Sequence, residues 1–270
     1  MRLALAQTEV VPGAVDANVD RALERVADAA ADGADLVALP ELFDVGYFAF
    51  DRYREVATGL DGETLSRMAA AADDHGVAVL AGSVVEDLAA SRAAGVETPA
   101  AGGLANTSVL FDSSGERRLV YRKHHLFGYG SAESDLLVAG ESVPTVELGE
   151  HVLGVTTCYD LRFPELYRDL VDAGATLVCV PSAWPYPRVE HWRLLPRARA
   201  VENLLYVAPV NGVGTFADAE LLGRSAVYDP WGTTLAAAVD EPATVTADVD
   251  RERVESVRAE FPALADRRER

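Results

Sequence analysis

Short hydrophobic runs alternate along the chain with segments whose apolar residues recur at helical spacing, which predicts strands and helices mixed throughout. Residues 2–7 predict a strand, and Asp16 is expected to cap a helix that ends at Gly33. Leu36 to Leu39 predicts a second buried strand, closed by Pro40. The remaining strands are expected at 77–85, 106–111, 117–121, 143–148, 151–157, 176–180, 205–211, 221–228, 233–238 and 243–249, and the remaining helices at 61–75, 164–173, 188–203 and after Asp250.

The order of these elements favours a single layered α/β domain over residues 1–270, with helices outside and sheets inside. Predicted hairpins, such as the one around Gly115, argue for mixed sheets over a plain parallel sheet. The Ala- and Gly-rich stretch 89–103 lacks periodicity and is interpreted as a surface loop, because strand patterns resume directly after it. Residues 122–142 are expected to form a long structured loop, and 267–270 a solvated tail.

The formal net charge is −19, from 43 acidic and 24 basic residues, and no basic cluster is present. The sequence therefore argues against a nucleic-acid binder. Self-repulsion of this size strains a compact protein in dilute buffer but is screened in molar salt, where the Debye length is ~3 Å. The composition favours a protein from a salt-rich cytoplasm over an ordinary acidic one. No apolar run approaches the ~20 residues of a membrane span, and the N-terminal strand lacks signal-peptide features, which predicts a cytoplasmic protein without a membrane partner.

A single lysine, Lys123, stands beside 23 arginines. Arginine therefore occupies almost every cationic position in the chain. Lysine offers a compact ammonium with three rotatable donors, whereas arginine carries a wide planar fork that does not readily lose a proton. Lys123 is therefore a candidate for a position where arginine cannot serve. The alternative is chance, and the neighbourhood of the residue decides between the two.

Three polar segments follow buried strands, where a rigid strand can deliver a side chain to an exposed loop. In the first, Glu41 follows Pro40 into the apolar company of Leu42 and Phe43. Such surroundings are expected to raise the pKa of the carboxyl group, which suits a general acid or base. The alternative is a surface glutamate just past a strand.

The second segment, Tyr121 to Phe127, contains Lys123 followed by His124 and His125. Adjacent side chains point in different directions, and the chain has no HExxH or CxxC partner, so neither a metal site nor another cofactor is expected. Glu133 lies further along the same loop.

In the third segment, an apolar strand delivers Cys158 to a sharp turn, and Pro164 begins a helix. A cysteine at a strand-to-helix elbow is placed as a nucleophile, with the next backbone N–H available to hold an oxyanion. Cys179 lies in the middle of a strand and is expected to be inert core. Two cysteines indicate neither a disulfide framework nor a cysteine-rich zinc site.

Taken in order, these segments resemble the nitrilase superfamily, also called carbon–nitrogen hydrolases, and the resemblance covers nearly the whole chain. The three principal matches are Leu39-Pro40-Glu41, Tyr121-Arg122-Lys123-x-His125-Leu126-Phe127 and Cys158-Tyr159-Asp160-Leu161-Arg162-Phe163-Pro164-Glu165. Supporting matches are Pro181-Ser182-Ala183-Trp184-Pro185, His191-Trp192, Arg197-Ala198-Arg199-Ala200-Val201-Glu202-Asn203 and Asp229-Pro230-Trp231-Gly232.

The resemblance implies a four-layer αββα sandwich with two mixed β-sheets and at least a homodimer. It implies a catalytic triad of Glu41, Lys123 and Cys158, with Glu133 as a supporting glutamate across a loop that is short here. Cys158 would attack the amide carbon, Glu41 would transfer the proton, and Lys123 would hold the oxyanion with the N–H of Tyr159. Water would then hydrolyse the thioester. An ammonium near the thiol is also expected to favour the thiolate.

The substrate prediction depends on Arg162, because an arginine at this position in similar proteins can bind a substrate carboxylate. The alternative is a structural ion pair from Arg162 to Asp160 or Glu165. Tyr47, Phe127 and Trp184 are candidates for the pocket wall, although each could be core. The segment around Cys158 most resembles the omega-amidase and deaminated-glutathione-amidase branch, which implies a small carboxylate-bearing amide and release of ammonia. N-carbamoyl compounds and nitriles are the alternatives, and a catalytically inactive binding module is a more distant one.

Overall fold

Fourteen strands and eight α-helices make up the described part of the chain, which comprises residues 1–217 and 219–268 of a computed structural model. The first sheet contains β1 (Arg2–Gln7), β2 (Leu36–Ala38), β3 (Ala78–Asp87), β4 (Leu104–Phe111), β5 (Arg117–Arg122) and β14 (Ala243–Asp248). The second sheet contains β6 (Thr145–Leu148), β7 (His151–Val155), β8 (Leu177–Ser182), β9 (Tyr206–Asn211), β12 (Ala226–Tyr228) and β13 (Thr234–Ala237).

Both sheets are mixed, and they have related strand orders. The first runs β14-β1-β2-β3-β4-β5, with β1, β2 and β3 parallel and the other pairings antiparallel. The second runs β13-β12-β9-β8-β7-β6, with β7, β8 and β9 parallel and the other pairings antiparallel. The mixed sheets predicted from the hairpins are therefore confirmed.

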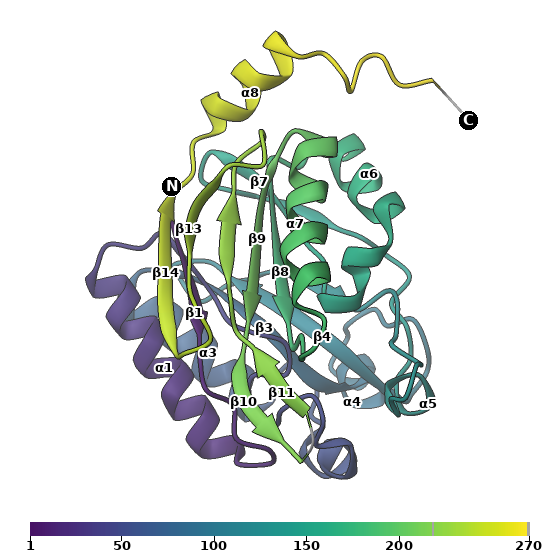
Figure 1. Cartoon of the computed structure of the whole chain (residues 1–270). Coiled ribbons are helices and arrows are strands. Elements are labelled where there is room, and N and C mark those ends of the chain that lie inside the picture. Colours follow the sequence, from purple (N-terminus) through teal and green to yellow (C-terminus); the bar gives the residue numbers. More distant parts are fainter. Residues whose placement is uncertain (218, 269–270) are drawn as a thin grey trace.

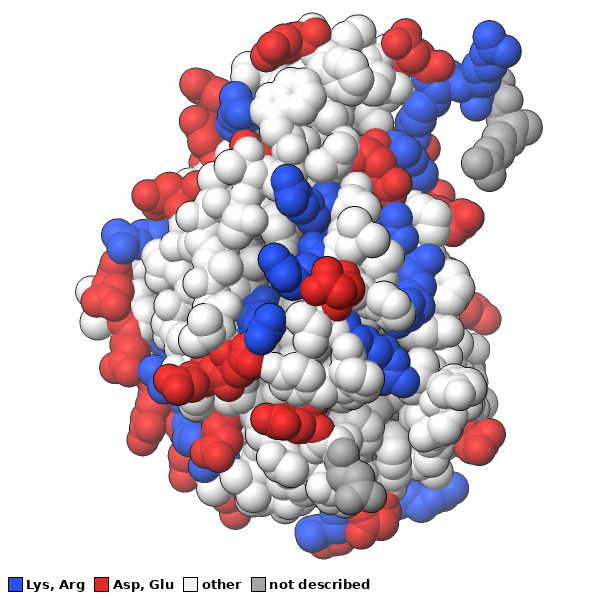
Figure 2. Space-filling view, in the orientation of Figure 1, with Lys and Arg blue, Asp and Glu red and all other residues white. Residues whose placement is uncertain are grey.

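Helices cover the outer face of each sheet (Figure 1). The helices α1 (Val15–Ala31) and α3 (Glu63–His75) pack on the first sheet. The helices α6 (Pro164–Asp172) and α7 (Val189–Asn203) pack on the second. This gives the expected αββα sandwich. On the face shown in Figure 2, acidic side chains spread around the outline while basic ones gather nearer the middle, over α7.

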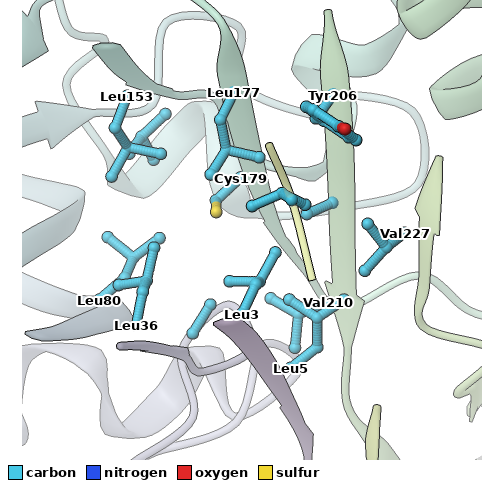
Figure 3. Close-up of a cluster of buried hydrophobic side chains, with 14 of the residues drawn as sticks. Leu3, Leu5, Leu36, Leu80, Leu153, Leu177, Cys179, Tyr206, Val210 and Val227 are labelled. Carbon is cyan, nitrogen blue, oxygen red and sulfur yellow. The ribbon is translucent and has the colours of Figure 1, made fainter. Parts of the chain in front are cut away.

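Apolar side chains fill the space between the two sheets (Figure 3). Leu3, Leu36 and Leu80 reach in from the first sheet, and Leu177 and Cys179 come from β8 of the second. Cys179 is completely buried in this cluster, and burial raises the pKa of its thiol to about 12. The expectation that Cys179 is core is confirmed.

Several local predictions are wrong. Asp16 does not cap α1: the N-cap is Ala14, and Asp16 lies in the first turn, where a carboxylate still interacts favourably with the helix dipole. The stretch 89–103 is not all loop, because the Asp87 side chain caps the short helix α4 (Leu88–Ala93).

The strand expected at 221–228 is two strands, β11 (Ala219–Leu222) and β12, and β11 pairs with a further strand, β10 (Val213–Phe216). The short elements η1 (Phe50–Arg52), α2 (Tyr53–Val56) and α5 (Glu133–Leu136) lie in segments where the sequence predicts a loop or no element. The last helix, α8 (Arg251–Glu260), begins directly after its N-cap, Asp250, as expected, and the predicted tail lies partly outside the described residues.

None of the helices among the described residues has the length and apolarity that a membrane-spanning helix requires. The ends of four strands converge at one edge of the sandwich. Glu41 follows β2, Lys123 follows β5, Cys158 follows β7, and Ala183 follows β8. The backbone N–H of Glu41 donates to the carbonyl of Ser182, which joins the two sheets at this edge.

Candidate active site

Cys158 lies at the predicted elbow between β7 and α6. It opens the 3₁₀ helix η2 (Cys158–Arg162) with a φ of 47°, which is strained for a residue other than glycine. A capping box fixes the turn: the Thr157 side chain accepts from the backbone of Asp160, and the Asp160 carboxylate accepts from the Thr157 N–H at 2.9 Å. The Tyr159 N–H lies in the first turn of η2, where helix geometry supplies no partner.

Glu41, Lys123 and Glu133 form a completely buried charged cluster. The Lys123 ammonium lies 2.8 Å from Glu41 Oε1, and 2.8 and 3.0 Å from the two oxygens of Glu133. All three side chains have no exposed surface. The surface-glutamate alternative for Glu41 is therefore wrong, and the short loop between Phe127 and Glu133 still brings Glu133 to the lysine.

Two further donors hold the carboxylates, and the sequence had not indicated either. The Asn106 side-chain amide donates to Glu41 Oε1 at 2.8 Å and to Glu133 Oε1 at 3.2 Å. The Ala183 N–H donates to Glu41 Oε2 at 2.9 Å. The only signal for Asn106 was its polar side chain in a predicted strand, and the neighbouring Thr107 and Ser108 give the same signal. The role of the Ala183 N–H depends on tertiary contact alone.

Burial dominates the electrostatics of the cluster. It raises the pKa of Glu41, and repulsion from Glu133 adds to this rise while Lys123 opposes it. Burial by itself lowers the pKa of Lys123, but the charges of Glu133 and Glu41 outweigh it and hold the pKa well above its usual value. The prediction of a raised Glu41 pKa is confirmed, and Lys123 is an ammonium.

As expected, the Lys123 ammonium acts to lower the pKa of the Cys158 thiol, but it does not decide the net direction. Burial and the charge of Glu41 raise the pKa of the Cys158 thiol well above its usual value, and the opposing effect of Lys123 is smaller. The thiol and Glu41 lie close enough for a side-chain hydrogen bond to contribute to the pKa of both. Cys158 is therefore a thiol at rest and needs a base to become a nucleophile.

A cavity of about 190 Å³ opens above Cys158 and Lys123. Its wall includes all five residues predicted to bind substrate, namely Tyr47, Phe127, Tyr159, Arg162 and Trp184. The Tyr47 hydroxyl also donates to Glu133 Oε2 at 3.0 Å, and the Tyr47 ring lies 5.3 Å from the Lys123 ammonium. Tyr47 thus connects the cavity wall to the charged cluster.

Arg162 stands in the cavity wall without a carboxylate partner among the residues described by the structure. Its guanidinium lies 5.1 Å from the Trp184 ring and 5.8 Å from the Tyr159 ring, and it contacts His191 at 3.1 Å. The alternative of an ion pair with Asp160 or Glu165 is not realised. Arg188, which sequence reasoning missed, also lines the cavity, with its guanidinium 5.5 Å from the Phe127 ring.

Of the two adjacent histidines, His125 is held by contacts that serve the structure. His125 Nδ1 and its backbone N–H both lie 2.9 Å from the buried Asp160 carboxylate, and the imidazole stacks on Phe163. Within the described ranges, no three His, Cys, Asp or Glu side chains are grouped so as to hold a metal ion.

Comparison with known proteins places this site in a family. Residues 2–259 match the family described as "Carbon-nitrogen hydrolase". The 2-oxoglutaramate amidase of Paenarthrobacter nicotinovorans is 39% identical over 239 residues, which cover 87% of this chain and 79% of that protein. The structure of Saccharomyces cerevisiae Nit3, described as a member of branch 10 of the nitrilase superfamily, superposes with a TM-score of 0.85 at 30% identity, covering 97% of this chain and 94% of Nit3.

An amidase from Nesterenkonia sp. AN1 is also similar, with a TM-score of 0.81 and 31% identity over 98% of this chain and 99% of that one. In that structure, of a mutant amidase, acrylamide has added to the active-site cysteine. The two mixed sheets, the cysteine elbow and the buried acid–lysine cluster define a hydrolase of carbon–nitrogen bonds. The chain belongs to the carbon–nitrogen hydrolase family, and it is an amidase-type enzyme.

Proposed function

We propose that this enzyme hydrolyses the amide group of a small carboxylate-bearing molecule through a thioester on Cys158. One observation carries the proposal: a thiol and a buried ammonium line one cavity, a buried carboxylate accepts from that ammonium at 2.8 Å, and the cavity wall holds an arginine, Arg162, with no acidic partner among the described residues. Glu41 is the general base, Lys123 the oxyanion donor, and Glu133 the carboxylate that holds Lys123 in place.

In the acylation step, Glu41 takes the Cys158 proton while the sulfur attacks the amide carbon. Glu41 suits this step because its raised pKa brings its basicity closer to that of the thiol. Negative charge develops on the former carbonyl oxygen, which accepts hydrogen bonds from Lys123 and the Tyr159 N–H. Glu41 then returns the proton to the departing nitrogen, and ammonia leaves a thioester on Cys158.

In the second step, water replaces the ammonia. Glu41 takes a proton from the water as its oxygen attacks the thioester carbon, and the same two donors stabilise the oxyanion. Collapse of the intermediate breaks the carbon–sulfur bond and returns the proton to the sulfur. The products are a carboxylic acid and the free thiol, so the cycle needs no cofactor.

The substrate class follows from Arg162 and from the size of the cavity. A guanidinium binds a carboxylate through two parallel hydrogen bonds. Arg162 lies against two aromatic rings and contacts His191, and it has no acidic partner in the described part of the chain. The volume of about 190 Å³ is below the ~300–1,000 Å³ of sites for drug-sized ligands. A similar protein is named a 2-oxoglutaramate amidase, and that compound is a small amide with a carboxylate.

Ammonia release from a panel of compounds tests the proposal. The panel contains omega-amides of 2-oxo acids, N-carbamoyl amino acids and aliphatic nitriles, assayed in molar KCl with Cys158→Ala as the blank. We expect the omega-amides to be turned over with the highest kcat/KM. Preference for the N-carbamoyl compounds or nitriles would reassign the substrate class, and activity in Cys158→Ala would refute the mechanism.

We also propose that the enzyme works as a homodimer. The helix α7 presents Leu194 and Val201 to solvent, with 64% and 45% of their surfaces exposed, and contact with a second copy would bury them. Light scattering of the purified protein should give twice the mass of one chain, 57.6 kDa against 28.8 kDa, and a monomer across micromolar concentrations would contradict the assembly.

A further inference from the structure

Asn106 completes a closed ring of hydrogen bonds with the charged groups of the site. Glu41 Oε1 accepts from both the Lys123 ammonium and the Asn106 amide, each at 2.8 Å. Glu133 Oε1 accepts from the same two groups, at 2.8 and 3.2 Å. Donors and acceptors thus alternate around the ring. The backbone takes part as well, because the Lys123 N–H donates to the Asn106 carbonyl at 2.9 Å.

The placement of Asn106 leaves one of its own polar atoms without a partner. The side chain is completely buried, and no group in the described part of the chain donates to its Oδ1. Turning the amide over would bring Oδ1 against two carboxylate oxygens, so the network fixes the orientation observed. An unsatisfied buried acceptor is unfavourable. An asparagine kept only for packing would not need this arrangement, whereas one that serves the two carboxylates does.

A neutral donor suits this position for an electrostatic reason. The ring holds two carboxylates and one ammonium, and Glu41 must keep enough basicity to deprotonate the Cys158 thiol. A second cation in place of Asn106 would pair with Glu41 and lower its basicity. The amide dipole supplies N–H groups to both acids without adding charge.

We propose that Asn106 is a positioning residue that sets the spacing and orientation of Glu41 and Glu133 and so aims Glu41 at Cys158. The inference rests on the proposed roles of Glu41 and Cys158. Asn106 acts on the reaction only through the two acids, because its amide donates to Glu41 Oε1 and Glu133 Oε1.

The test compares Asn106→Leu and Asn106→Asp with a matched control. Both variants keep the approximate shape of asparagine and remove its donors. The control is Asn203→Leu at the end of α7, because Asn203 is also completely buried, also leaves its Oδ1 unpartnered among the described residues, and donates only to the Arg199 carbonyl. The three variants and the wild type are measured for melting temperature, kcat, KM and the pH dependence of kcat/KM.

We expect kcat to fall about 10- to 100-fold in both Asn106 variants, the range for losing a hydrogen bond to an ionised group, while KM changes less than about threefold. Because the lost donor stabilised the ionised form of Glu41, the acidic limb of the profile should move to higher pH. Asn203→Leu should lower the melting temperature and leave kcat and the pH profile unchanged.

A wild-type kcat and pH profile in either Asn106 variant would overturn the proposal. So would an equal loss of kcat in Asn203→Leu, or failure of both Asn106 variants to fold, which would assign the residue to the fold. Alkylation of Cys158 by iodoacetamide, followed against pH, separates this test from the proposed function because it needs no substrate. If the wild type releases no ammonia but the alkylation profile still shifts in Asn106→Leu, the positioning role stands and the substrate assignment fails.

Discussion

Replacement of Lys123 by arginine tests whether the single lysine is present for its shape. The change keeps the positive charge, so any loss reports geometry. In the structure the ammonium fits between three carboxylate oxygens at 2.8–3.0 Å, with no exposed surface. A guanidinium is planar and several atoms wide, so its nitrogens cannot occupy the ammonium position without displacing Glu41 or Glu133.

The expected losses of kcat and of stability follow from the two roles of the Lys123 ammonium, which are to hold the oxyanion and to neutralise two buried carboxylates. Removing one oxyanion donor typically costs ~3–4 kcal/mol of transition-state stabilisation, which lowers kcat by about 10²- to 10³-fold, and we expect a loss of this size in Lys123→Arg. Its fold should lose less stability than that of Lys123→Met, because both carboxylates still face a cation although the larger side chain displaces them. Lys123→Met should lose as much activity as Lys123→Arg. Near neutral pH its free energy of unfolding should also fall by ~3–5 kcal/mol, because two buried carboxylates are left uncompensated. That destabilisation should shrink as the pH falls and the acids take up protons.

Steady-state ammonia release and denaturant unfolding measure these two quantities separately. The neighbouring Arg122 offers a matched control with the reverse exchange: its guanidinium binds the buried Glu86 carboxylate at 2.7 and 2.8 Å, away from the cavity. Arg122→Lys should cost stability and leave kcat within about threefold, since no oxyanion donor is lost. Near-normal turnover in Lys123→Arg would refute the argument from the shape of lysine.

Four further predictions concern other parts of the molecule. In the wild type, the acidic limb of kcat/KM should have its midpoint above the ordinary glutamate pKa of 4.5, because the base is the ionised form of Glu41 and its pKa is raised; a midpoint at or below 4.5 would contradict this. Iodoacetamide should alkylate Cys158 and leave Cys179 intact by mass spectrometry, whereas equal slow reaction of both thiols would favour an inactive binding module. Arg162→Gln should lower kcat/KM about 10- to 100-fold for a carboxylate-bearing amide and leave a neutral amide of similar length unaffected, so an equal effect on both would count against carboxylate binding. With a net charge of −19, the melting temperature should rise between ~0.01 and ~1 M KCl as the Debye length falls from ~30 to ~3 Å, and a flat or falling curve would contradict the prediction that this composition suits high salt.

Local patterns were sufficient to predict most strands and helices and the mixed sheets, whereas the four-layer arrangement was predicted from the family resemblance. The strand–helix order, the hairpin at β4 and β5, and the elbow at Cys158 each follow from short-range signals such as periodicity, turn residues and Pro164. The elements that the sequence did not predict are short ones. The helix α4 depends on a single capping side chain, Asp87, and β10 and β11 are four residues each, too short to show a clear strand period.

The sequence predicted which side chains belong to the site, but not their net pKa shifts or all of their hydrogen-bond partners. Cys158 and Lys123 stand out in their own segments, whereas Glu41 was predicted chiefly, and Glu133 entirely, from the resemblance to the nitrilase superfamily. The structure brings all four together. Net electrostatics were not predictable, since the direction of the Cys158 pKa depends on burial and on Glu41 as well as on Lys123. Partners such as Asn106 are set by which strands become neighbours, and no pattern within one strand reports that.

The double pairing of Lys123 also has a consequence for the acyl-enzyme. A thioester is open to attack by amines, and the only lysine of the chain lies beside the sulfur that would carry it. Aminolysis needs a lone pair on nitrogen, and the two carboxylates keep this nitrogen protonated. The acyl group is therefore not trapped as a permanent amide of Lys123, and water can hydrolyse the thioester.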